Sequence, residues 1–146
     1  MTAFLVVSAF AAIALIHVYW AFGGSLGKEA AVPRAPAALG SNPSTPRPAA
    51  FVPTRAATLA VAAMLMLVAV LVGLQAGWLG SSLQHVFLRI AIGGVAAVMF
   101  LRAVGDFRLV GFFKRASDTR FARLDTWLYS PLCIVLGAGL LAVALG

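Results

Sequence analysis

Four long apolar runs constrain this chain more than any other feature of its sequence. They cover about residues 2–22, 58–79, 86–104 and 127–145, and each is close to the ~20 residues that an α-helix needs to cross the hydrocarbon core of a bilayer. Backbone polar groups in lipid must be paired within the spanning segment, so runs of this kind form helices. The sequence therefore predicts an all-α fold, a four-helix transmembrane bundle that forms one integral membrane domain over residues 1–146.

The positive charges are confined to two of the connecting segments. Ten of the eleven Lys and Arg residues lie between the first and second runs, or between the end of the third run and the start of the fourth; only Arg89 lies on the other side. An even number of spans puts both basic segments on one face, which the positive-inside rule makes cytoplasmic. We predict a multi-pass protein of the cell inner membrane with both termini outside the cytoplasm.

Composition limits the partners and the chemistry. The isoelectric point of about 11.2 would indicate nucleic acid in a soluble protein, but cations beside membrane spans attract anionic lipid by ~1 kcal/mol each. The predicted partners are therefore membrane lipids, above all anionic ones, together with a second copy of the chain or another membrane protein, and no nucleic acid. The single cysteine, Cys133, excludes enzymes that form disulfides through paired thiols.

No metal or cofactor is predicted. The two histidines, His17 and His85, are expected near opposite ends of their spans, so most of a ~30 Å core separates them and they are not expected to bind one haem.

The two basic segments differ in pattern. The loop over residues 23–54 holds six of the seven prolines, which predicts an irregular, mobile segment; the alternative is an ordered lid that docks through residues 49–52. In the loop over residues 105–126, Ser117 or Asp118 is expected to cap a short amphipathic helix in the headgroup plane. A new helix is then expected to start at Ser130 and Pro131.

Polar and aromatic side chains are expected to converge at the cytoplasmic rim of the bundle. On an ideal helix Arg102 and Asp106 are one turn apart, which predicts an ion pair. Histidine, tyrosine, carboxylates and several cations at one rim could bind an anionic headgroup or a polar substrate with an apolar tail. The candidate ligand-binding residues are His17, Trp20, Arg102, Asp106, Lys114, Arg120, Arg123, Asp125 and Tyr129.

We hypothesise that Lys114, Arg120 and Arg123 hold an anionic headgroup against a wall formed by His17, Trp20 and Tyr129. The same groups could instead form a structural network.

Two other functions stay open. A small-molecule or lipid transporter needs polar groups near the membrane midplane, and only Gln75 and small residues approach it. A membrane enzyme would use His17, Asp106, Asp125 or Tyr129, and would need a pocket that joins them.

Two motifs carry a family resemblance. The runs HVYWAFGG, at residues 17–24, and TRFARLDTWLYSPLC, at residues 119–133, resemble a family of small four-span bacterial membrane proteins classed as a domain of unknown function. The resemblance covers essentially the whole chain and implies a fold and a location, but no activity. The Pro/Ala insertion at residues 35–48 departs from the pattern expected for that family.

Overall fold

The computed structural model describes residues 1–34, 48–78, 86–105, 109–114 and 119–146. Its elements are α1 (Thr2–Ala21), α2 (Lys28–Ala31), α3 (Arg55–Gln75), α4 (Val86–Val104), α5 (Arg120–Leu124), the π-helix η2 (Asp125–Tyr129) and α6 (Ser130–Leu145). Four helical stretches are long and apolar enough to cross a membrane: α1, α3, α4 and the continuous run of α5, η2 and α6. The all-α membrane bundle predicted from the apolar runs is confirmed; α5 lies where a short helix was expected, but it is continuous with the fourth span.

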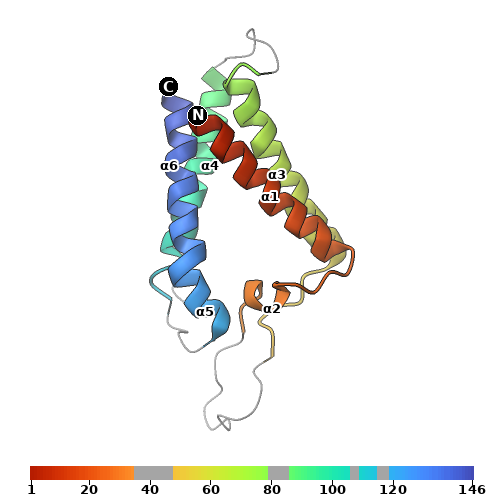
Figure 1. The fold of residues 1–146 in the computed structure, drawn as a ribbon. Coiled ribbons are helices and arrows are strands. Elements are labelled where there is room, and N and C mark those ends of the chain that lie inside the picture. Colours follow the sequence, from red (N-terminus) through yellow and green to blue (C-terminus); the bar gives the residue numbers. More distant parts are fainter. Residues whose placement is uncertain (35–47, 79–85, 106–108, 115–118) are drawn as a thin grey trace.

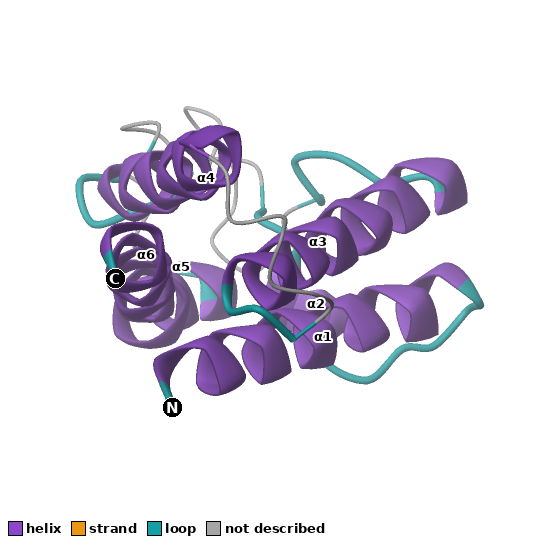
Figure 2. Cartoon of the chain, turned by 90° about the horizontal axis from the view of Figure 1, so that it is seen from above, coloured by secondary structure: helices purple, strands orange, loops and turns teal. Residues whose placement is uncertain are grey.

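The spans pack as two pairs, α1 with α3 and α4 with α6 (Figures 1 and 2). Both chain termini lie at one end of the bundle, and the two pairs diverge toward the other end, where α2 contacts α5 (Figure 1). We call that second end, formed by α2, α5 and the described residues next to them, the basic end. The connectivity thus brings both basic segments of the sequence to one end of the molecule.

The buried core lies in the half of the bundle near the termini. Its side chains come from all four spans: Val6, Phe10, Val68, Ala69, Val72, Ile92, Ala96, Leu136, Leu140 and Ala144. Glycines allow the spans to approach closely there. A Cβ on Gly137 would lie 3.1 Å from the Phe100 ring, and one on Gly139 would lie 2.6 Å from the Val6 side chain. This core joins the two pairs near the termini.

Local capping moves two helix starts from their predicted places. Helix α3 begins at Arg55, before the predicted residue 58, because the Thr54 hydroxyl accepts a hydrogen bond from the Ala57 N–H at 3.2 Å. Helix α5 likewise begins at Arg120, because the Thr119 hydroxyl accepts a hydrogen bond from the Ala122 N–H; the expected caps Ser117 and Asp118 lie outside the described residues. Helical structure therefore starts seven residues before the predicted fourth span.

Helix α6 begins at Ser130 with Pro131 in its first turn, as predicted, but no break separates it from α5, because a π turn carries the helix through to this point. The Ser130 N–H donates to the Asp125 carbonyl, five residues back. Pro131 lies in the first turn of α6 and has no backbone N–H that would need an acceptor. One helical run therefore extends from the basic end to the C-terminus.

Candidate functional site

A fully buried carboxylate, Asp125, lies at the centre of the basic end. Arg102 Nη2 donates to its Oδ1 at 2.8 Å, the Gly111 N–H donates to its Oδ2 at 2.6 Å, and Lys114 Nζ lies 3.2 Å from Oδ2. Asp125 has no exposed surface. Removing a charge from water costs several kcal/mol unless partners replace the solvent, and here both carboxylate oxygens are occupied.

Lys114 is buried in the same network. Its side chain is only 4% exposed, and Nζ also donates to the Gly111 carbonyl at 2.9 Å and to the Thr126 hydroxyl at 2.5 Å. The Thr126 hydroxyl in turn donates to the Ala122 carbonyl at 3.2 Å. With three oxygen partners, the ammonium group of Lys114 has no donor left for an external ligand.

The segment after α4 brings Gly111 and Lys114 to the carboxylate. Helix α4 ends at Val104, and Gly105 and Gly111 both adopt positive φ, at +94° and +87°. A Cβ on Gly105 would lie 2.6 Å from the Gly111 Cα, so the two backbones touch. The Phe112 N–H donates to the Ala103 carbonyl at 2.9 Å, and the chain thereby folds back on the end of α4.

Arg102 pairs with Asp125, which lies 23 residues away in sequence. The expected pair with Asp106 assumes that the helix continues, but α4 ends two residues before Asp106, which lies outside the described residues. Arg102 keeps 32% of its side chain exposed, so this member of the network also reaches solvent.

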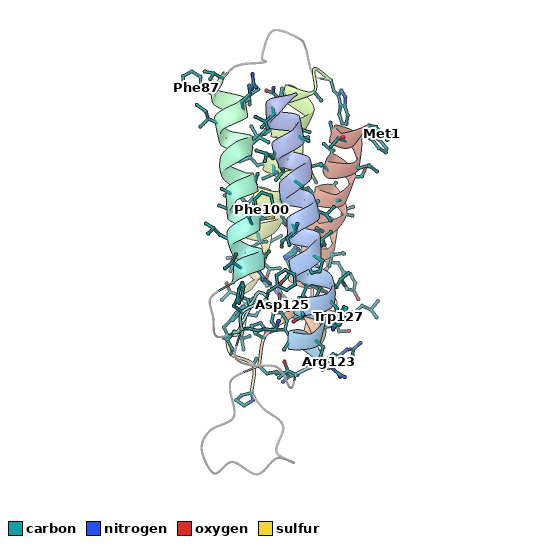
Figure 3. All side chains as sticks on the ribbon, turned by 90° about the vertical axis from the view of Figure 1, so that its left-hand side faces the viewer. Met1, Phe87, Phe100, Arg123, Asp125 and Trp127 are labelled. Carbon is teal, nitrogen blue, oxygen red and sulfur yellow. The ribbon has the colours of Figure 1, made fainter. Side chains whose placement is uncertain are left out.

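Arg120 and Arg123 lie outside this network. Both are exposed, and neither has a hydrogen-bond or ion-pair partner in the part of the chain that the structure describes. Trp127, four residues after Arg123, is 83% exposed. Figure 3 shows Arg123 and Trp127 projecting from the same side of the run of α5 and η2, whereas Asp125 points inward toward α4. The basic end thus presents two exposed guanidinium groups, and that of Arg123 lies on the same side as the exposed Trp127 indole.

The aromatic candidates hold backbone groups. Trp20 Nε1 donates to the Leu26 carbonyl at 2.8 Å, and the Tyr129 hydroxyl donates to the Ala30 carbonyl at 3.1 Å. His17 Nδ1 lies 2.8 Å from the Ile13 carbonyl, and its ring meets the edge of Trp20 with centroids 5.1 Å apart. Trp20 and Tyr129 therefore both hold the backbone of the segment around α2.

The candidates that the structure describes, which exclude Asp106, thus separate into distinct groups. Arg102, Lys114 and Asp125 form one cluster, whereas His17 and Trp20 form another on α1. Sequence reasoning missed Gly111 and Thr126, which complete the Asp125 cluster. A signal for Gly111 was present, since a glycine shortly after a span and before a lysine is typical of a turn that needs positive φ.

A separate cavity of about 520 Å³ lies between α2 and the chain entering α3. It contains no predicted site residue, and its lining is Ser25, Lys28, Glu29, Val32, Arg34, Ala49, Phe51, Val52 and Pro53. Among the described residues, no group of three His, Cys, Asp or Glu side chains is placed to hold a metal ion.

Fold and site together define a small integral membrane protein with four spans and a buried ion-pair network at one end. Over residues 10–140 the chain matches the model of a family described as a protein of unknown function, DUF3995, and it belongs to this family. The membership confirms the resemblance found in the sequence. Comparisons with curated proteins and with solved structures gave no match.

Proposed function

We propose that this protein is a non-catalytic membrane protein that binds the headgroups of anionic phospholipids through Arg120 and Arg123, at an end of the bundle that faces the cytoplasm. The observation that carries the proposal is the contrast between the cations. Arg102 and Lys114 are used within the protein, whereas Arg120 and Arg123 are exposed without a partner among the described residues.

The chemistry of these side chains fits a phosphate group. Arg presents a planar fork of donors that can hold two phosphate oxygens at once. Arg120 and Arg123 are three residues apart on α5, so they lie on neighbouring positions of one helix surface. A phosphodiester at this surface can therefore contact both groups.

Trp127 supports a lipid as the source of that phosphate. Its indole is 83% exposed at the depth where the basic segment meets the apolar span, and Trp is favoured at the membrane interface. Beyond it, Ile134 and Val135 are exposed along α6, and they offer an apolar path for acyl chains. The lipid headgroup would thus contact α5, its acyl chains would contact α6, and Trp127 would lie between them at the membrane interface.

The geometry of Asp125 argues against catalysis at this end. A general base must lie within hydrogen-bond reach of its substrate, but Asp125 has no exposed surface, and Arg102, Gly111 and Lys114 surround its carboxylate. The hydroxyl of Tyr129 is likewise used on a backbone carbonyl.

The test compares lipids bound to purified variants. Protein in mild detergent is mixed with phosphatidylglycerol or phosphatidylcholine, and bound lipid is counted by native mass spectrometry. We expect the double variant Arg120→Gln and Arg123→Gln to lose most bound phosphatidylglycerol with an unchanged thermal midpoint. Arg55→Gln removes an exposed cation at the start of α3, away from Trp127, and should retain the lipid.

Two results would contradict the proposal. Equal loss of lipid in Arg55→Gln would mean that net charge alone attracts it, and unchanged binding in the double variant would place the lipid elsewhere. The double variant Arg120→Lys and Arg123→Lys keeps the charge that sets topology, and we expect it to bind with intermediate occupancy. Reporter fusions after Gly146 should behave as extracytoplasmic; a cytoplasmic reporter would reverse the proposed orientation.

A further inference from the structure

The cavity of about 520 Å³ beside α2 lies between two short segments of the chain that joins the first two spans. Residues 25–34 contribute one wall and residues 49–53 contribute the other. The backbone ties the walls together, because the Ala50 N–H donates to the Pro33 carbonyl at 2.8 Å, next to an antiparallel bridge between the two segments. The volume falls within the roughly 300–1,000 Å³ that is usual for small-ligand pockets.

Both walls are attached to the ends of spans. Trp20 Nε1 donates to the Leu26 carbonyl and the Tyr129 hydroxyl donates to the Ala30 carbonyl, which holds the wall that contains α2. The other wall leads directly into α3, whose first turn is capped by Thr54. The cavity therefore lies next to the ends of α1 and α3, at the level of the lipid headgroups when these helices span a bilayer (Figure 1). Walls that are already held in place lose little further freedom when a ligand binds.

The lining combines apolar side chains with charges of both signs. Four residues supply most of the apolar part: Val32, Phe51, Val52 and Pro53. Lys28 and Glu29 add an ammonium group and a carboxylate, and Arg34, which already takes part in another interaction of the protein, adds a second cation. Adjacent residues of a helix point in different directions, and within the described ranges no ion pair joins Lys28 to Glu29. A ligand in the cavity thus meets a positive and a negative group at separate points of one wall.

We infer that this cavity binds the headgroup of phosphatidylethanolamine. The lipid phosphate accepts hydrogen bonds from the Lys28 ammonium group, and the lipid ammonium group donates to the Glu29 carboxylate. Adjacent Cα atoms are about 3.8 Å apart, so the two charges of a headgroup joined by a two-carbon link can reach both side chains. The apolar part of the lining contacts the glycerol backbone and the first methylenes of the acyl chains.

The charge pattern selects this headgroup over others. An anionic lipid without an amine would bring its charge against Glu29 and leave that carboxylate without a donor. Phosphatidylcholine carries a positive charge but has no N–H to donate to the carboxylate. The cavity is also separate from the surface proposed for anionic phospholipids, because neither Arg120 nor Arg123 lines it.

The test measures the affinity of the purified protein for two lipids in mild detergent. Short-chain phosphatidylethanolamine or phosphatidylcholine is titrated in, and bound lipid is counted by native mass spectrometry. We expect the wild type to prefer phosphatidylethanolamine. Glu29→Gln should weaken phosphatidylethanolamine binding about fivefold and leave phosphatidylcholine binding unchanged, with the same thermal midpoint because Glu29 is exposed. Lys28→Gln should weaken both, since both lipids carry the phosphate. Equal affinities in the wild type, or a preference that survives Glu29→Gln, would overturn the inference.

Two controls distinguish the cavity from α5 and a lipid from a soluble ligand. The double variant Arg120→Gln and Arg123→Gln should retain phosphatidylethanolamine even where it loses phosphatidylglycerol; loss of phosphatidylethanolamine as well would place it on α5 and overturn the inference. Glycerophosphoethanolamine has the same headgroup without acyl chains and should bind much more weakly. Binding as tight as that of the lipid would mean that the apolar lining is not used and that the ligand is not a phospholipid.

Discussion

Replacing Asp125 by Asn removes the negative charge that neutralises two cations at the basic end. The shape of the side chain is retained, so the effect reports charge and hydrogen bonding. Lys114, 4% exposed, would then face Arg102 with no carboxylate between them. The amide can still accept from the Gly111 N–H, but its NH₂ group would point at a cation.

The magnitude follows from burial. Removing one partner of a buried ion pair typically costs about 3–5 kcal/mol, because an uncompensated charge remains. Arg102 is 32% exposed and can be partly hydrated once the carboxylate is lost. We therefore expect Asp125→Asn to cost an amount at the lower end of this range, about 3 kcal/mol of unfolding free energy. Arg102→Met should cost less, about 1–2 kcal/mol, because Asp125 keeps Lys114 and the Gly111 N–H.

The assay is equilibrium unfolding in mixed micelles, followed by helical circular dichroism. A double-mutant cycle of Asp125→Asn with Lys114→Met should cost at least ~1 kcal/mol less than the sum of the two single variants, because the second change removes the charge that the first leaves unpaired. Arg120→Gln is the control and should stay within about 0.5 kcal/mol of the wild type. A loss below about 1 kcal/mol for Asp125→Asn would refute the view that the network is desolvated.

Three further variants test other contacts. Gly105→Ala should lower the free energy of unfolding by more than about 2 kcal/mol in the same assay, because Gly105 has a positive φ and a Cβ there would clash with the backbone of residues 110 and 111. The control Gly93→Ala should be nearly neutral, because a Cβ at Gly93 meets nothing within 4 Å. Arg89→Gln should cost about 1–2 kcal/mol of unfolding free energy, because Arg89 donates to the last two carbonyls of α6 at 2.6 and 3.3 Å; an unchanged midpoint would mean that water replaces it fully. Tyr129→Phe loses the bond to the α2 backbone and should speed tryptic cleavage after Lys28 in folded protein; cleavage at the wild-type rate would show that α2 is held by other contacts.

The four spans could be predicted from the sequence, because a long apolar segment in a bilayer must pair its backbone polar groups within itself and therefore forms a helix. The sequence also identified Arg102, Lys114 and Asp125 as candidates, since the topology was expected to bring charged side chains near the inner ends of the spans together at one rim. Their mutual pairing could not be predicted, because it joins residues 23 apart in sequence through the packing of α4 against α6.

Rules applied to single residues did not predict how the helices end and continue. The pair of Arg102 with Asp106 was predicted on the assumption of an unbroken helix, but Gly105 takes φ of +94° and α4 ends at Val104. Asp106 lies outside the described residues, so this pair stays a prediction. A separate helix was predicted to start at Ser130 and Pro131; α6 does start there, but a π turn joins it to the helix before it. Thr126 was not singled out because its value as a lysine partner depends on where Lys114 folds back.

The pairing of spans has a consequence for biosynthesis. Each pair is a helical hairpin that is contiguous in the chain, since α1 and α3 precede residue 79 and α4 and α6 follow residue 85. The ribosome therefore delivers one complete hairpin to the membrane before the next begins, and helices that form first in lipid associate afterwards. The second hairpin is pinned at both ends by arginines of α4, Arg89 near the C-terminus and Arg102 at the π turn. Two separately translated halves, divided between α3 and α4, should accordingly find each other in the bilayer and rebuild the shared core.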